Sequence, residues 1–369
     1  MAAKRPVIIY GASGFSGRLV AEYLREYNVP FVAAGRSAGK LKEVLERVPG
    51  IETADYEIVQ AGHSKGELTR LFEGARVVCN TVGPFIYNGP VVAEACLAAG
   101  CHYLDISGEQ AWIREASEKW GAKFAKQGLL IAPATAFMST PSDIAARVCL
   151  EKAAIDTLEI VTMFRGMPTF GSTQTIFAVL QTEAHYLEQN QYKRWPATTT
   201  FEVVVPGQIQ TQLALAWGGF PHPVWYKEHP QIANVKSIGG LLDREIMKNV
   251  AATEKLYQET IEPLPPAERE RKLAEMANSV QAGTPPRENP RVNRTIDFVV
   301  GRGATDFVQC AVFGTCCYQQ TGLIQAFAAH SLVHEAPRKT GFASAAQAFG
   351  HYELLKVLES HGLSKLKML

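Results

Sequence analysis

The stretch VIIYGASGFSGRLVAEYL, residues 7 to 24, constrains the fold of this chain more than any other segment. Its first residues, 7 to 10, are a short apolar run rich in β-formers, which favours a strand buried on both faces. Glycines follow at a GxxGxxG spacing, and residues 18 to 27 then carry an apolar face at helical spacing. The stretch therefore predicts a strand, a glycine turn and a helix, the arrangement that dinucleotide-binding folds place around a pyrophosphate.

Each glycine of this turn has a separate predicted role. Gly11 permits the tight turn, Gly14 lets the backbone approach a pyrophosphate, and Gly17 lets the helix pack on the strand. The N–H groups at the start of the helix would then face the anion. The spacing differs from the commoner GxGxxG and is typical of extended dehydrogenases and of NADP enzymes.

Arg36 indicates which dinucleotide is bound. A second strand is expected at residues 30 to 34, and it ends in Gly35-Arg36-Ser37. NAD enzymes usually place an Asp or Glu there to bind the ribose 2′-hydroxyl, whereas a guanidinium suits a 2′-phosphate through forked, charge-assisted hydrogen bonds. We therefore expect NADP as the cofactor.

Strands and helices continue to alternate along the first part of the chain. Further strands are expected at 57–60, 75–80, 101–106 and 129–132, with helices at 40–47, 65–72, 91–99 and 112–127. This order predicts an α/β domain at residues 1–150 with a doubly wound, Rossmann-type parallel sheet. Ligands bind at the carboxyl ends of such strands, which brings Asn80 to Pro84 and Ser107 to Glu109 to the same edge as the glycine turn.

The pattern changes after residue 150. Strands are expected at 158–164 and 201–205, a helix at 173–188, and a hairpin from 294–300 to 305–313. We expect residues 151–330 to form a second, α+β domain, with an antiparallel sheet, that binds substrate and mediates dimerisation. Residues 262–290 are rich in proline and charge and predict a surface excursion around one helix. Residues 314–334 and 347–361 are expected to be helical, and the C-terminal segment 331–369 to pack back on the first domain.

Composition excludes several classes of protein. The formal net charge of +1 over 369 residues, without a basic run, argues against a nucleic-acid partner. No stretch approaches the roughly 20 apolar residues of a membrane span, and the N-terminus, with Lys4 and Arg5, does not resemble a signal peptide, so we expect a cytoplasmic protein. Seven cysteines without a CxxC predict free thiols and no metal site.

Four segments together resemble a known family: GASGFSGRLVAEYL, AAGRS, CNTVGPFIYNGPVVAEACLAAGCHYLDISGE and PATAFMSTPSDIAA. They are similar to the saccharopine dehydrogenase-like oxidoreductases, which include saccharopine reductases, animal saccharopine dehydrogenase-like oxidoreductases and bacterial trans-acting enoyl reductases. The resemblance covers residues 6 to 150 and returns at residues 341 to 350. The motifs are specific for the family and not for a substrate.

The resemblance implies a set of cofactor-binding residues. The pyrophosphate would be held by Gly11, Ser13, Gly14, Phe15, Ser16 and Gly17, and the 2′-phosphate by Arg36 and Ser37. Asn80, Val82, Gly83 and Pro84 would line the ribose and nicotinamide, and Ser107, Gly108 and Glu109 would close the site. Met138 replaces an Asp that the family often carries; if that Asp contacts substrate in relatives, its role has changed or moved here.

Hydride transfer sometimes needs an acid beside the nicotinamide. We expect Tyr87, on the loop after the fourth strand, and Glu109 to be the catalytic side chains, while His102 and Tyr103 are interpreted as structural.

The arginines of the second domain are scattered and aromatic residues are abundant, so we expect NADPH-dependent reduction of an activated C=C, C=O or C=N bond in a hydrophobic molecule. We also expect a homodimer. Alternatives are a saccharopine-type amino-acid dehydrogenase and a non-enzymatic NADP-binding sensor or scaffold. The aromatic loop at residues 217 to 226 suits a pocket or a subunit interface as well as plain packing.

Overall fold

The computed structural model describes residues 5–280 and 285–369, and the chain divides into two compact units. The first unit comprises the chain up to Ser107, Trp112–Thr140 and Tyr318–His361. The second comprises Gly108–Ala111, Pro141–Cys317 and Gly362–Leu369. Residues 1–4, which include Lys4, and part of the expected proline-rich excursion, 281–284, lie outside the described residues.

The first unit is built on a seven-stranded sheet in the order β15-β6-β5-β4-β1-β2-β3. All neighbouring strands are parallel. The strands are β1 (Val7–Tyr10), β2 (Phe31–Gly35), β3 (Tyr56–Gln60), β4 (Val77–Asn80), β5 (His102–Asp105), β6 (Leu130–Ala132) and β15 (Gly341–Phe342). The apolar β1 is fully buried at the centre, between β2 and β4, which is the switch point of a doubly wound sheet.

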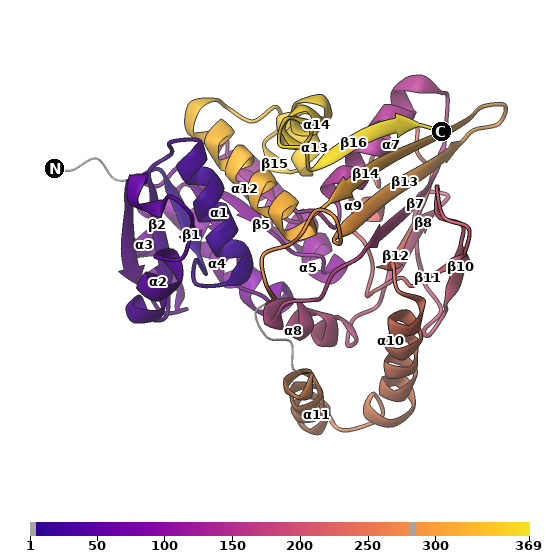
Figure 1. The fold of residues 1–369 in the computed structure, drawn as a ribbon, viewed down its shortest axis with the longest axis horizontal. Coiled ribbons are helices and arrows are strands. Elements are labelled where there is room, and N and C mark those ends of the chain that lie inside the picture. The colour runs from indigo at the N-terminus through magenta and orange to yellow at the C-terminus, as the bar shows by residue number, and fades with distance from the viewer. Residues whose placement is uncertain (1–4, 281–284) are drawn as a thin grey trace. The chain divides into compact units, whose positions relative to one another are not determined.

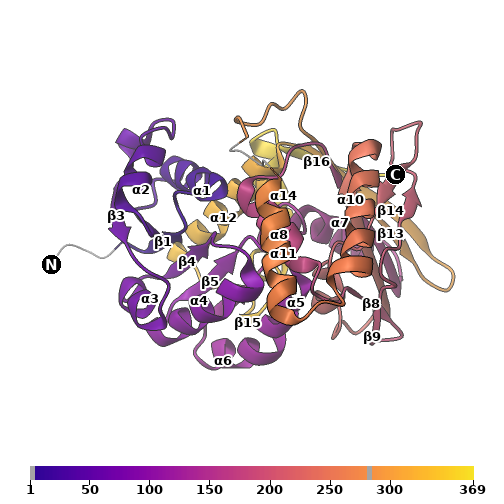
Figure 2. The same ribbon diagram turned by 90° about the horizontal axis from the view of Figure 1, so that it is seen from below.

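Helices cover both faces of this sheet, with α1, α2 and α12 on one side and α3, α4 and α6 on the other (Figure 2). The bounds are α1 (Phe15–Glu26), α2 (Ala38–Leu45), η1 (Ile51–Thr53), α3 (Lys65–Phe72), α4 (Phe85–Ala99), α5 (Gln110–Glu115), the π-helical turn η2 (Ala116–Trp120), α6 (Gly121–Lys126), α12 (Cys317–His334), α13 (Ala345–Phe349) and α14 (His351–Ser360). In α12, Gly322 lets the helix approach α1 closely, since a Cβ there would lie 2.7 Å from Leu19 Cβ.

Helix α4 starts six residues earlier than the sequence pattern predicted. The helix was expected over residues 91–99, yet it begins at Phe85 and contains Pro90. Packing overrides the local preference here, because Gly89 lies against the ring of Trp112, where an added Cβ would come within 2.6 Å. Tyr87 is therefore helical, and its expected place on a loop was wrong.

The second unit contains a seven-stranded sheet in the order β16-β14-β13-β7-β12-β8-β9 and a two-stranded pair, β10-β11. Figure 1 shows β13 and β14 as a long hairpin with β16 beside β14. The bounds are β7 (Thr157–Phe164), β8 (His185–Glu188), β9 (Gln191–Arg194), β10 (Phe201–Val203), β11 (Gln212–Ala214), β12 (Asn234–Leu241), β13 (Arg294–Arg302), β14 (Phe307–Thr315) and β16 (Ser364–Met368). The sheet is mixed rather than antiparallel as expected, because β12 pairs with β7 in parallel.

The helices of the second unit are α7 (Thr140–Lys152), α8 (Phe170–Val179), α9 (His222–Trp225), α10 (Arg244–Leu256), the π-helical turn η3 (Tyr257–Ile261) and α11 (Pro266–Ser279). The helix expected over 173–188 was wrong in its second half. It stops at Val179, and residues from His185 form β8, where Leu187 is buried opposite Val235 of β12. Pairing with β12 thus decides the conformation of a segment whose own sequence favours neither state strongly.

The observed unit bounds differ from residues 150 and 330. The first unit gives way to the second at Thr140 and resumes at Tyr318, because α12 packs on α1 through Gly322. Residues from Gly362 belong to the second unit, because β16 pairs with β14. The predicted fold class, a Rossmann-type parallel sheet with a second α+β domain, is confirmed by the two sheets.

Candidate functional site

The turn between β1 and α1 has no room for larger side chains at two of its glycines. Gly11 has φ +96°, and a Cβ there would lie 2.6 Å from Thr81 Oγ1. A Cβ on Gly17 would lie 2.5 Å from the carbonyl oxygen of Gly11. The turn is thus folded tightly against its own backbone and against the end of β4, while Gly14, its outermost glycine, is exposed.

The N-terminus of α1 is suited to an anion. Its first turn has no acidic residue, and no side chain caps it through a hydrogen bond. Ser13 and Ser16 are half-buried beside the exposed Gly14. Phe15 packs edge-on against Tyr318, with ring centroids 5.1 Å apart, so its ring has a structural role in addition to the predicted one. The glycine cradle and the uncapped helix start fit a pyrophosphate.

Arg36 is exposed directly after β2, as a 2′-phosphate partner must be. Ser37 caps α2, and its Oγ accepts a hydrogen bond from the backbone N–H of Lys40 at 3.3 Å. The Ser37 hydroxyl therefore retains its proton for a ligand while its oxygen supports the helix.

A tyrosine–histidine pair, which the sequence analysis missed, lies at the same edge of the sheet. The hydroxyl of Tyr10 lies 3.1 Å from the carbonyl oxygen of Gly62 and 2.9 Å from His63 Nδ1, and the two rings are stacked. Since a carbonyl can only accept, Tyr10 donates to Gly62 and His63 donates through Nδ1, which leaves Nε2 for another partner. Burial lowers the pKa of His63, and the charge of Arg36 lowers it further.

The buried side chain of Asn80 holds the loop after β4 in place through hydrogen bonds. Its Nδ2 donates to the hydroxyl of Tyr103 at 3.2 Å, and its Oδ1 accepts from the backbone N–H of Val82 at 3.1 Å. Gly83 and Pro84, which follow, are half-buried. The fully buried Asn80 therefore positions the predicted cofactor loop through its hydrogen bonds.

Asp105, at the end of β5, is a second residue that the sequence analysis missed. Its fully buried carboxylate accepts hydrogen bonds from Tyr103 Oη (2.7 Å), Trp112 Nε1 (2.6 Å), Ser107 Oγ (2.6 Å) and the backbone N–H groups of Ser107 and Ala134 (2.9 Å each). The hydroxyl of Ser107 is thus directed at Asp105. A buried, fully bonded carboxylate of this kind holds the loops after β5 and β6 in place.

The two predicted catalytic residues have contrasting surroundings. Tyr87 lies in the first turn of α4 with 56% of its surface exposed, whereas Glu109 is buried with 1% exposed, next to the half-buried Gly108. His102 accepts a hydrogen bond from the backbone N–H of Leu130 at 2.9 Å, and burial lowers its pKa to about 4. His102 and Tyr103 both hydrogen-bond within the protein, as a structural role requires, and that role stays a prediction.

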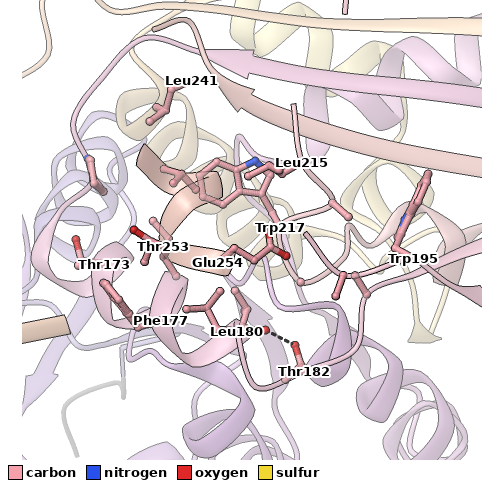
Figure 3. A pocket seen from close by; sticks show the side chains of 18 of the residues that line it. Thr173, Phe177, Leu180, Thr182, Trp195, Leu215, Trp217, Leu241, Thr253 and Glu254 are labelled. Atoms are coloured by element: carbon pink, nitrogen blue, oxygen red, sulfur yellow. Dashed lines mark hydrogen bonds between the residues drawn. The ribbon is translucent and has the colours of Figure 1, made fainter. Parts of the chain in front are cut away.

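The second unit contains an apolar cavity of about 350 Å³ that opens to the surface and is formed by α8, α10, the ends of β11 and β12 and the loop after β9 (Figure 3). Its wall includes Phe177, Leu180, Trp195, Leu215, Trp217 and Leu241. This volume is in the range of small-molecule sites. Of the aromatic loop at 217–226, Trp217 lines the cavity, whereas Phe220, Trp225 and Tyr226 are buried, so the loop serves both a pocket and plain packing.

Polar atoms of the cavity wall are largely bonded to the protein itself. Thr173 Oγ1 donates to the carbonyl of Thr169 at 3.1 Å, and Thr182 Oγ1 to that of Val179 at 2.9 Å. Trp217 Nε1 donates to the carbonyl of Gly239 at 2.5 Å. These bonds leave apolar surface facing the cavity.

All seven cysteines are free and buried. Within residues 5–280 and 285–369, no group of three or more His, Cys, Asp or Glu side chains is arranged to hold a metal ion. Nor does any helix in the described part of the chain combine the length and the apolar character that crossing a membrane requires.

Two different family models match two parts of the chain. Residues 140–369 match a family of unknown function, DUF5938. The chain belongs to this family. Residues 7–131 match the saccharopine dehydrogenase NADP binding domain, which covers the glycine turn, Arg36 and the ends of β4 and β5. In the sequence of this DUF5938 protein, the region that matches DUF5938 follows the region that matches the NADP binding domain.

Curated relatives match part of this DUF5938 protein, and three of them illustrate the match. A lipid droplet localized protein of Caenorhabditis elegans is 35% identical over 146 residues, which are 37% of this chain and 34% of that protein. A trans-acting enoyl reductase of Mycobacterium ulcerans is 33% identical over 153 residues (41% and 36%). The human saccharopine dehydrogenase-like oxidoreductase is 32% identical over 152 residues (37% and 35%). The chain thus spans about a third of the length of these relatives.

These matches confirm the resemblance to the saccharopine dehydrogenase-like oxidoreductases in the nucleotide-binding part, and NADP as the cofactor of that domain. They agree with the prediction of an oxidoreductase.

Proposed function

We propose that this protein is an NADPH-dependent reductase that transfers a hydride to an activated double bond (C=C, or C=O or C=N) of a hydrophobic small molecule. The observation that carries the proposal is the apolar cavity in a unit that belongs to the same chain as an NADP-binding domain. A trans-acting enoyl reductase among the relatives supports the same class of reaction.

Different residues of the first unit would hold different parts of the cofactor. The glycine turn and the start of α1 would bind the pyrophosphate, and Arg36 with Ser37 the 2′-phosphate. Asn80, through its bond to Val82, would fix the loop that lines the nicotinamide. When bound, NADPH supplies the hydride, and a proton from a side chain or from water completes the reduction.

Tyr87 and Glu109 remain our proposed catalytic residues. Tyr87 is exposed and follows the cofactor loop closely, and its hydroxyl would donate the proton to the substrate. The saccharopine-type reaction and the NADP sensor remain alternatives. The homodimer, the cytoplasmic location and the lack of a nucleic-acid partner also remain predictions.

A panel of substrates tests the proposal. The purified protein would be mixed with NADPH and, separately, with hydrophobic enones, ketones, imines and keto acids, and the loss of NADPH absorbance followed. We expect turnover with one class of uncharged hydrophobic substrates, which would name the bond reduced. Turnover with amino-acid-derived keto acids alone would favour the saccharopine-type alternative, and NADPH binding without any consumption would favour the sensor.

A further inference from the structure

Charged groups at the cavity of the second unit are few, and their arrangement is uneven. Three of the described lining residues are charged: Glu183, Arg194 and Glu254. Arg194 Nη1 and Glu183 Oε1 form an ion pair at 3.1 Å, and both side chains are more than half exposed, at 55% and 54%. This pair is neutral as a whole and lies in water-accessible surroundings, so it contributes little to the charge inside the cavity.

Within the described residues, Glu254 forms no ion pair with a cationic side chain, and it is more buried than Glu183 and Arg194. It projects from the last turns of α10, and Figure 3 shows it beside Trp217 among the apolar side chains of the wall. The backbone N–H of Thr198 hydrogen-bonds its carboxyl, while burial raises the pKa of the group. One N–H cannot satisfy a carboxylate, which has room for several donors.

We propose that the cavity is a binding site for an uncharged hydrophobic molecule that carries a hydroxyl group, and that the Glu254 carboxylate accepts the hydrogen bond from this hydroxyl and excludes ligands bearing a carboxylate. The inference rests on the proposed function in one respect, since the ligand would be the substrate or its apolar part.

The selectivity follows from the chemistry of the wall. The apolar side chains bind the body of the ligand, and the bonded hydroxyls of Thr173 and Thr182 do not compete for its polar end. A hydroxyl gains a charge-assisted hydrogen bond at Glu254. A second carboxylate placed beside the half-buried Glu254 is repelled, because like charges repel each other more strongly where water is partly excluded.

Direct binding of two matched probes tests this site. Decanol and decanoate have the same chain and differ in the charge of the head group, and both would be titrated, at pH about 8, against protein loaded with the uncharged dye Nile red. We expect decanol to bind at least about tenfold more tightly than decanoate. Glu254→Gln should reduce this preference to within about threefold, because an amide can bond either head group.

Glu259→Gln is the matched control. It makes the same change one turn further along, at a side chain that is 61% exposed and pairs with Lys255, so the wild-type preference should persist. Val250→Trp, in the cavity wall, should weaken both probes; if it fails to fold, as judged by thermal melting, the two glutamine variants still decide. Equal binding of both probes to the wild type, or an unchanged preference in Glu254→Gln, would overturn the proposal.

The titrations contain no NADPH and follow no turnover. A loss of probe selectivity would therefore refute the cavity assignment and leave the reductase proposal standing. Conversely, selective probe binding in a protein that never consumes NADPH would refute the reductase and leave the binding site.

Discussion

At the scale of single residues, the first unit contains predicted cofactor-binding residues and residues whose hydrogen bonds within the protein position the loops of the site. The sequence alone does not reveal the second group. Arg36 is exposed where a 2′-phosphate partner was expected. Asn80 and Ser107, expected to contact the cofactor, hydrogen-bond the protein itself, to Val82 and Asp105 respectively. Their bonds place the loops, so substitutions there should act on the shape of the site as well as on contacts.

Tyr87→Phe tests the proposed proton donor. We expect kcat to fall by at least about tenfold with KM changed less than about threefold, because the hydroxyl acts in the chemical step while the ring stays in place. Steady-state kinetics with the substrate found in the panel would measure this. Tyr352→Phe, at another exposed tyrosine (49%), is the control. Wild-type turnover in Tyr87→Phe would remove this residue as the donor.

His63 predicts a pH dependence of cofactor choice. Its pKa lies below the ordinary 6.5 because of burial and Arg36, so the ring is neutral in the free protein at pH 7. A 2′-phosphate near Arg36 would favour the protonated ring, and NADPH binding would then take up a proton, so the preference for NADPH over NADH should rise as pH falls towards that pKa. Binding titrations over pH should show a steeper rise in the wild type than in His63→Gln. Parallel curves would refute this contribution.

At the scale of elements, a buried hydrogen bond between two polar side chains links β13 to β7. Asp297 of β13 lies directly across from Thr162 of β7, and its Oδ1 accepts a hydrogen bond from the Thr162 hydroxyl at 2.7 Å. Asp297 is fully buried, and its pKa is raised to about 8 by burial, although bonds from Thr162 and Ser142 oppose the shift. The β7–β13 contact therefore contains a carboxyl that stays protonated at neutral pH.

Asp297→Asn should change how stability depends on pH. Between about 4 and about 8 the folded state retains a proton on Asp297 that the unfolded state has lost, so this group lowers the free energy of unfolding as pH rises through that window, by at most about 1.4 kcal/mol per pH unit. The amide cannot ionise, so the variant should gain stability relative to the wild type as pH increases. Denaturant unfolding at several pH values measures the difference. A constant difference across the window would show that Asp297 does not titrate as described.

At the scale of the whole molecule, the first unit could be predicted because its central strands are buried on both faces. Runs such as Val7–Tyr10 are apolar throughout, and glycine turns separate them from the helices. The glycine turn and Arg36 were visible for the same reason, since their chemistry depends on local spacing. Asp105 and the Tyr10–His63 pair gave no such signal, because their partners come from other strands and loops.

The second unit was harder to predict because its sheet is assembled by pairing. Strand β12 contains Lys236, Ser237 and two adjacent glycines, which argue locally against a strand, yet it lies between β7 and β8.

One strand of the first unit was equally hard to predict. Strand β15 has only two residues and extends the first sheet through its pairing with β6. Glu254 was not singled out either, since it becomes part of a site only when α10 and the loop after β9 come together.

NADP recognition at Arg36 is the central feature of the proposed site, and calorimetric titration of NADPH and NADH measures it. The wild type should bind NADPH at least about tenfold more tightly than NADH, and Arg36→Asp should lose at least about tenfold in NADPH affinity while NADH affinity is spared, because the variant lacks the forked partner of the 2′-phosphate. Lys42→Asp, at an exposed lysine of α2, should leave both affinities near their wild-type values. Equal binding of the two dinucleotides, or unchanged NADPH binding in Arg36→Asp, would contradict the cofactor site on which the proposed reductase rests.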